Sequence, residues 1–308
     1  MNREANSRFG LSDTLMLAAV VMWGINFILV KIALREIPPA GFNGLRILLT
    51  AVLFFLILAV SGRGFGIRGS DIGKLFAIGV VGNAVYQVFF IRAMSLTTAS
   101  NTSLILSLSP VFVVLLGVLL RIERIHWAAW AGIAISLGGL YLVITRQDGG
   151  LHFSAASFKG DLAIFIGTMI WATYTVLSKP FLERISPLQF STITMGFGAL
   201  FYVPLTAKDI GRIPWKAVSP QAWTALVLSA FFGLILGYLI WYYSVKKVGN
   251  AKTAIYSTLT PVFTVVFASI FLREKIHGFQ IAGALIIFAG VYMTRAGYKF
   301  IRKAGSDL

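Results

Sequence analysis

Long apolar runs separated by short polar gaps fill the chain almost from end to end. Each run holds about twenty residues, the length that an α-helix needs to cross a bilayer core at about 1.5 Å per residue. The runs lack the alternation of a membrane β-strand. The pattern therefore predicts an all-α membrane protein with ten spanning helices, at 11–34, 40–61, 72–91, 99–120, 127–145, 162–178, 188–207, 222–244, 253–272 and 279–294.

The chain also repeats itself. Residues 107–126 recur as residues 258–277 at an offset of 151, with eight identities in twenty positions. At an offset of 148, Trp23 and Lys31 return as Trp171 and Lys179. Five helices per copy is an odd number of crossings, so the second copy is predicted to enter the membrane from the opposite side, as an inverted repeat. The predicted units are 11–145 and 160–297, with cytoplasmic tails at 1–10 and 298–308.

Composition places the chain in a bilayer. Of its 308 residues, 57% are hydrophobic and 12% are charged, and the mean hydropathy is +0.83. The net charge of +16 does not indicate nucleic acid, because the Lys and Arg residues occupy the gaps between runs, where they meet lipid headgroups. Sixteen of them fall on the side that holds the termini and ten on the other, so both termini are predicted to be cytoplasmic. The first run has no cleavage pattern behind it and is expected to stay in place.

The sequence offers no constellation for catalysis or for metal binding. All eleven acidic residues lie in loops, tails or helix ends, the three histidines lie at or beyond helix ends, and there is no cysteine. A membrane enzyme therefore has little support, and we expect neither a cofactor nor a metal ion. The lack of a carboxylate at mid-membrane also separates this chain from proton-coupled exporters of lipophilic cations.

Two prolines interrupt equivalent runs. Pro110 and Pro261 each remove a helical hydrogen bond and free the carbonyl of Leu106 or Ser257. They indicate either a hinge beside a central cavity or a bend that improves packing. A passive scaffold would need neither.

Three basic residues lie within or near the ends of runs. Arg46, six positions into the second run, could hold a substrate carboxylate. An arginine near a helix end more often snorkels or caps backbone carbonyls, and we favour that structural role. Lys31 and Lys179, in the last turns of helices one and six, are expected to complement helix dipoles at the interface.

Polar and aromatic side chains inside the runs are the candidates for substrate binding. An aromatic stripe is usually packing, but an amide in hydrocarbon is costly unless it meets another helix, water or a substrate. Glycines on helices five and ten favour close packing, so those helices are expected to form a scaffold or dimer surface away from the cavity. The candidates are Trp23, Asn26, Asn83, Tyr86, Gln87, Asn101, Trp171, Tyr174, Tyr238, Trp241, Tyr242, Tyr256 and Ser257.

The ten runs, the doubled Pro-Val-Phe followed by glutamate eleven residues later, and the Trp23/Trp171 and Lys31/Lys179 pairs resemble the EamA-type transporters of the drug/metabolite transporter superfamily. Within that superfamily the chain is most similar to the YddG-type exporters of bacterial inner membranes. The resemblance implies a central cavity between helices one, three, four, six, eight and nine, with alternating access. Four-helix relatives that export cations carry a glutamate in the first helix, where this chain has Asn26 and apolar residues.

The leading hypothesis is an inner-membrane exporter of aromatic and other neutral amino acids. The rings of such substrates would stack on the aromatic side chains, and their charged groups would meet amides and freed carbonyls. Export of another small metabolite or drug-like compound fits the sequence as well. The expected partners are therefore a small-molecule substrate and the lipid bilayer.

Overall fold

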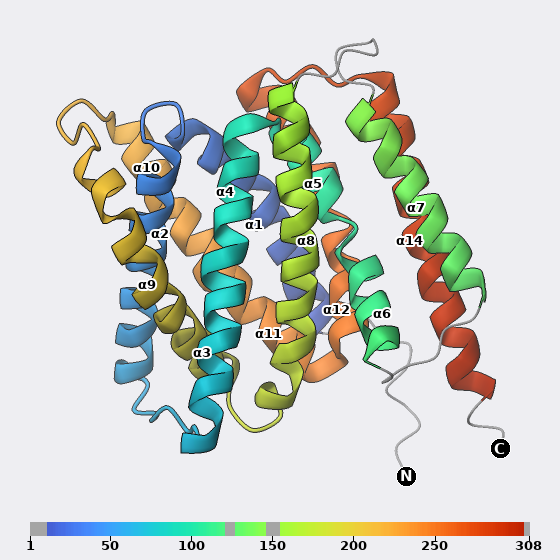
Figure 1. The fold of residues 1–308 in the computed structure, drawn as a ribbon, viewed down its shortest axis with the longest axis horizontal. Helices are drawn as coiled ribbons and strands as arrows, with labels where there is room; N and C mark the ends of the chain where they lie inside the picture. The colour runs from blue at the N-terminus through green and yellow to red at the C-terminus, as the bar shows by residue number, and fades with distance from the viewer. Residues whose placement is uncertain (1–10, 121–126, 146–154, 305–308) are drawn as a thin grey trace.

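The computed structural model describes residues 11–120, 127–145 and 155–304, and within these ranges the regular secondary structure is all helical. The all-helical prediction is therefore confirmed for this part of the chain. The predicted loop that carries Glu123 and His126, and the tail at 1–10, lie outside the described residues. The helices stand side by side along one common direction (Figure 1).

The first half contains six α-helices that cover four predicted runs, and a seventh covers the fifth run. The gaps between runs contain helix caps, such as Thr98, whose hydroxyl accepts from the backbone of Asn101 and caps a new helix. The elements are α1 (Leu11–Ala33), α2 (Pro39–Val60), the 3₁₀ turn η1 (Gly69–Asp71), α3 (Ile72–Val80), the π-helical turn η2 (Val81–Val85), α4 (Tyr86–Leu96), α5 (Ala99–Leu106), α6 (Ser109–Leu119) and α7 (Trp127–Thr145).

The second half follows the same plan. Ser186 begins one helix through a capping box with Gln189, and Ser219 caps another, each directly before a proline that suits the first helical turn. The elements are α8 (Ala155–Leu182), α9 (Pro187–Gly211), α10 (Pro220–Leu228), the π-helical segment η3 (Ser229–Leu236), α11 (Gly237–Val248), α12 (Asn250–Ser257), α13 (Thr260–Phe267), the π-helical turn η4 (Ala268–Leu272) and α14 (Gly278–Ala304).

The helices have the length and composition of membrane spans. In the described ranges, seven helical segments are long and apolar enough to cross a membrane, and three shorter apolar ones cover Trp130–Val143, Thr260–Leu272 and Gly278–Met293. The protein is thus a multi-pass helical membrane protein. Ten crossings remain a prediction. The last helix runs to Ala304, well beyond its predicted end at residue 294.

Both predicted interruptions at proline are present. A break at Ser107 and Leu108 separates α5 from α6, and an equivalent break separates α12 from α13. Each proline stands in the first turn of the second helix, where its missing N–H leaves no intrahelical bond unmade. The Ser107 and Ser257 hydroxyls donate to carbonyls three residues earlier, at 2.6 Å in both cases. A role for Pro110 and Pro261 as hinges stays a prediction.

The π-helical segments η2 and η3 were not foreseen, since the runs at 72–91 and 222–244 read as continuous helices. They occupy equivalent places in the two halves, and each contains a glycine, Gly82 or Gly233, separated by the repeat offset of 151. A Cβ at Gly82 would collide with the Tyr174 ring, and one at Gly233 would collide with the Asn26 amide. Since Tyr174 follows Asn26 by 148 residues, the two close approaches are copies of each other.

The pair α7 and α14 shows how the halves are related. The two helices lie side by side at one edge of the molecule (Figure 1) and meet through small residues. A Cβ at Gly139 would touch the Gly283 carbonyl, and one at Gly290 would touch the Gly132 carbonyl. At the offset of 151, Gly290 corresponds to Gly139 and Gly283 corresponds to Gly132, so the two contacts are equivalent. These contacts repeat in exchanged order, as in an isologous two-fold interface between antiparallel helices. The pair lies away from the central cavity, as expected.

Contacts between loops are related by the internal repeat in the same way. The Glu36 carboxylate, in the loop after α1, accepts from the Ser219 backbone at 2.6 Å and from its hydroxyl at 2.7 Å. These hydrogen bonds lower the pKa of the Glu36 carboxyl. At the offset of 148, Arg184 corresponds to Glu36 and Asp71 corresponds to Ser219. Arg184 and Asp71 form an ion pair at 2.8 Å. Contacts of different chemistry therefore fill equivalent places.

Candidate functional site

A central cavity lies between the two halves, with about 590 Å³ of empty space including its opening. Its wall combines aromatic rings, two amides, hydroxyl groups and one arginine. The side chains come from α1, α2, α4, α5 and α6 of the first half and from α8, η3, α11, α12 and α13 of the second. The lining residues are Trp23, Asn26, Phe27, Arg46, Tyr86, Gln87, Phe90, Ser103, Leu106, Ser109, Trp171, Gly233, Leu234, Tyr238, Ser257 and Thr260.

Seven of the thirteen predicted binding residues line this cavity. They come from helices that are distant in the sequence, which supports the expectation that polar and aromatic side chains inside the runs converge. The seven are Trp23, Asn26, Tyr86, Gln87, Trp171, Tyr238 and Ser257. Their role in substrate binding is taken up under the proposed function.

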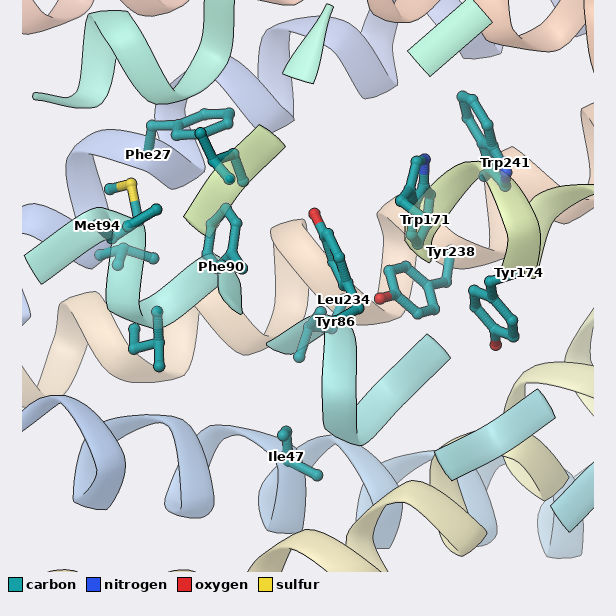
Figure 2. Packing of buried hydrophobic residues seen from close by; sticks show 14 of the residues in the cluster. Phe27, Ile47, Tyr86, Phe90, Met94, Trp171, Tyr174, Leu234, Tyr238 and Trp241 are labelled. Atoms are coloured by element: carbon teal, nitrogen blue, oxygen red, sulfur yellow. The ribbon is translucent and has the colours of Figure 1, made fainter. Parts of the chain in front are cut away.

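Aromatic rings form one continuous wall around Trp171. Its ring centroid lies 5.2 Å from that of Tyr86, 5.4 Å from that of Tyr238 and 5.6 Å from that of Trp241. Figure 2 shows these four rings grouped together. Trp23 extends the group, with its ring 5.4 Å from Trp241 and its indole N–H donated to the Gly233 carbonyl at 3.1 Å. Such tilted pairs gain electrostatic as well as hydrophobic stabilisation.

Four predicted residues do not line the cavity, namely Trp241, whose ring belongs to this wall, and Asn83, Tyr174 and Tyr242 behind it. Trp241 and Tyr242 are fully buried within the aromatic cluster. The Tyr174 hydroxyl accepts a hydrogen bond from the Asn83 amide at 2.9 Å and pairs with the Thr194 hydroxyl at 2.8 Å. The rings of Tyr174 and Tyr242 pack against each other, and the rings of Trp241, Tyr174 and Tyr242 pack against Trp171 or Tyr238, so they help to hold in place the rings that face the cavity.

Asn101 and Tyr256 lie elsewhere. The Asn101 amide oxygen accepts from Gln280 of α14 at 2.7 Å, and the Tyr256 hydroxyl donates to Asp13 at the start of α1. Both therefore join helices to one another outside the cavity. Sequence alone placed them on helices that reach the cavity, but it did not show which way their side chains face.

Arg46 is the residue that the sequence reasoning assigned to the wrong role. Instead of snorkelling, its side chain is 1% exposed and lines the cavity. Its guanidinium donates to Gln87 Oε1 at 2.6 Å, to Asn43 Oδ1 at 2.9 Å and to Ser229 Oγ at 3.1 Å. The Ser229 hydroxyl in turn donates a hydrogen bond to Asn26 Oδ1 at 2.8 Å. Arg46 thus joins α2 to α4 and to η3.

A polar cluster closes one end of the bundle. The Lys31 ammonium donates to the Thr97 carbonyl at the C-terminus of α4, so it complements that helix. Glu274 accepts from the backbone N–H groups of Ala99 and Ser100, at the N-terminus of α5, where a negative charge is favoured. Lys179, the repeat mate of Lys31, is exposed at the other end. The two ends therefore differ in packing although their sequences correspond.

The lining of the cavity provides no group for covalent chemistry. No aspartate, glutamate or histidine lines it within the described part of the chain, and no cluster there could hold a metal ion. What the wall offers is shape, aromatic faces, hydrogen bonds and one positive charge. These are properties of a binding cavity.

Residues 10–145 and 158–296 each match the model of the EamA-like transporter family. The chain belongs to this family. Both halves match the same model, which agrees with the internal repeat. Family membership identifies a transporter of small molecules rather than an enzyme, in keeping with the multi-pass helical structure.

Curated relatives resemble the chain over nearly their whole length. An "Uncharacterized transporter" of Archaeoglobus fulgidus is 30% identical over 92% of this chain and 98% of its own. A "Probable amino-acid metabolite efflux pump" of Salmonella typhimurium is 27% identical over 94% and 96%. A "Probable terminal-alkyne amino-acid exporter" of Streptantibioticus cattleyicolor is 25% identical over 90% and 91%.

One solved crystal structure shares the fold. It superposes with a TM-score of 0.69 at 20% sequence identity and covers 94% of this chain and 98% of its own. The likeness extends through both halves, so the overall helical arrangement is that of a fold already solved.

Proposed function

We propose that this transporter exports aromatic and other neutral amino acids through the central cavity, as the YddG-type exporters do. The observation that carries the proposal is the wall of rings formed by Tyr86, Trp171 and Tyr238. The ring centroids of Tyr86 and Tyr238 lie 5.2 Å and 5.4 Å from that of Trp171, and the rings face a cavity that also presents amides. A flat or apolar side chain gains stacking and dispersion energy on such a wall. The names of the efflux pump and exporter relatives point the same way.

Alternating access supplies the transport step in this proposal. All ten runs cross the membrane, and the two five-helix units lie in opposite orientations around a two-fold axis in its plane. The broken helices α5–α6 and α12–α13 cross at the cavity, where the Ser109 and Ser257 hydroxyls lie 3.1 Å apart. Pro110 and Pro261 then act as hinges on which one end opens while the other closes.

The proposed location is a bacterial inner membrane with both termini in the cytoplasm. The excess of Lys and Arg residues on the side of the termini supports this orientation. In Figure 1, α1 starts and α14 ends at the same end of the molecule, as the proposal requires.

A second candidate is export of a different small metabolite through the same cavity. It is favoured by the name of the Salmonella typhimurium relative, which describes the efflux of an amino-acid metabolite rather than of an amino acid. A competition panel of amino acids and other metabolites separates the two, since only the first candidate requires aromatic competitors to rank highest.

Exchange of labelled phenylalanine in proteoliposomes tests the proposal. We expect the wild type to exchange phenylalanine and Trp171→Ala to lose about tenfold or more in apparent affinity, because stacking on a buried ring is worth roughly 1–2 kcal/mol. Trp130→Ala is the matched control, since Trp130 lies on α7 and is 51% exposed. Wild-type protein inert towards every amino acid tested would refute the proposal.

A further inference from the structure

The positive charge of Arg46 stands alone in the cavity wall. Among the described residues that line the cavity, it is the only charged one. Its three acceptors are two amide oxygens and a hydroxyl, and none of them carries a negative charge. The Nε atom is buried and has no hydrogen-bond partner. Because a guanidinium has five N–H donors, two remain to be satisfied.

The fold itself does not require an arginine at this place. At the offset of 148, the equivalent of Arg46 in the second half is Thr194. Thr194 is fully buried, pairs with the Tyr174 hydroxyl at 2.8 Å and donates to the Phe190 carbonyl at 2.8 Å. The equivalent site of the same architecture is thus filled by a neutral side chain with local bonds.

The surroundings keep the guanidinium in a fixed orientation. Its carbon lies 5.4 Å from the ring centroids of both Phe42 and Phe90, so two aromatic faces hold the plane. Asn43 is also bonded to Gln87, since its side-chain amide donates to the backbone carbonyl of Gln87 at 3.3 Å. Arg46 is therefore positioned before any ligand arrives.

An ionised side chain inside a membrane span is unfavourable unless it is paired, and its usual partners are acidic groups. No carboxylate lines this cavity within the described residues, so the partner has to come from the ligand. We propose that Arg46 binds the carboxylate of the transported molecule and that this carboxylate is the group on which recognition depends. The inference deepens the proposed function, because it assumes that the central cavity is the transport site.

The amino group of a substrate is treated differently by the same wall. An ammonium ion would find ring faces and neutral oxygens there, but no negative side chain among the described lining residues. An aromatic acid that lacks the ammonium group therefore keeps the charged contact, whereas an aromatic amine that lacks the carboxylate loses it. The cavity should therefore bind molecules that carry a carboxylate more tightly than molecules that carry only an ammonium group.

Two fragments of phenylalanine make the test direct. Phenylpropionate retains the ring and the carboxylate, and phenethylamine retains the ring and the ammonium group. With purified wild-type protein in detergent, we expect phenylpropionate to stabilise against heat at concentrations about tenfold or more below those at which phenethylamine does. A charge-assisted hydrogen bond accounts for a factor of that order.

Arg46→Gln should erase the difference, with weaker binding of phenylpropionate and unchanged binding of phenethylamine. Arg46→Lys keeps a charge but not the planar fork, so it should fall between the two. Arg92→Gln is the matched control, because Arg92 is exposed on α4 and absent from the cavity wall. Should Arg46→Gln not fold, the wild-type ranking and Arg46→Lys decide.

The outcomes separate this inference from the proposed function. A wild type that prefers phenethylamine, or an Arg46→Gln variant that binds phenylpropionate unchanged, overturns the role of Arg46 even if phenylalanine is transported. A wild type that carries no amino acid but binds phenylpropionate through Arg46 overturns the amino-acid proposal and leaves the carboxylate site standing.

Discussion

Single glycines decide how closely the two halves approach at the cavity. Gly233 lies on the cavity wall, beneath the Asn26 amide, and its carbonyl accepts the Trp23 indole N–H. Gly82 receives the Tyr174 ring in the equivalent place. A side chain at either position would push the facing helix outward, since packed interiors have little room to absorb an added methyl group.

Gly233→Ala should therefore lower the free energy of unfolding by about 1–3 kcal/mol and weaken ligand binding, because it displaces Asn26 and Trp23 together. Thermal unfolding in detergent, with and without ligand, measures both effects. Gly73→Ala is the control, as a Cβ at this helical position of α3 meets open space and should be neutral or slightly stabilising. Equal behaviour of the two variants would contradict the steric argument.

At this scale the sequence predicted residue types better than residue roles. Trp171 and Gln87 line the cavity as expected, because side chains with polar groups inside an apolar run need a partner or a cavity. Arg46 was expected to snorkel because of its distance from a helix end, whereas its hydrogen bonds to Gln87 and Ser229 hold it in the interior. Asn101 faces α14, and periodicity alone does not tell which neighbouring helix a buried face meets.

At the scale of elements, the broken helices α5–α6 and α12–α13 each have a continuous helix as an alternative conformation. At each break the hydroxyl of Ser107 or Ser257 donates to the carbonyl three residues earlier. Since each proline sits in a first turn, it favours the start of a new helix without straining the one that it begins. It also disfavours a continuous helix through Ser107 or Thr258.

Pro110→Ala combined with Pro261→Ala should allow both helices to close into continuous ones. If the breaks serve as hinges, phenylalanine exchange slows by about tenfold or more while ligand-induced stabilisation changes little, because a conformational step rather than binding is affected. Exchange rate and binding are measured on the same preparation. Unchanged exchange in the double variant would identify the breaks as packing features only.

The sequence revealed these breaks because proline has a local effect that is independent of packing. The π-helical segments η2 and η3 gave no such signal, since an extra residue in one turn hardly alters an apolar run. In retrospect, the paired glycines Gly82 and Gly233 marked them. A glycine repeated in both halves of a duplicated chain indicates a close approach that the fold uses twice.

At the scale of the whole molecule, the α7–α14 pair holds the ends of the two halves together and contributes no side chain to the cavity lining. Its contact depends on glycine backbones at van der Waals distance, with the Ser136 hydroxyl near the Ile287 carbonyl at 3.5 Å. Such small-residue contacts stabilise helix pairs in lipid, where burial of apolar surface contributes little.

Gly139→Leu should separate this pair, and neighbouring Gly138→Leu should not, because a Cβ at Gly138 meets open space and one at Gly139 meets Gly283 and Ile287. We expect the first variant to lose about 2 kcal/mol or more of stability through overpacking. The folded fraction should keep wild-type ligand binding. Thermal unfolding of both variants, with phenylpropionate and phenylalanine as ligands, provides the comparison, and loss of binding in Gly139→Leu would show that the pair supports the cavity after all.

The exchanged contacts of α7 and α14 have a historical implication. Ser136 and Ile287 are repeat mates that meet each other, so the seam is complementary to itself. A separate half-length chain carrying such a seam could pair with a second copy of itself through the same contact. Gene duplication followed by fusion would then have needed to add only a connecting segment, after which each half became free to diverge, one towards arginine and the other towards threonine.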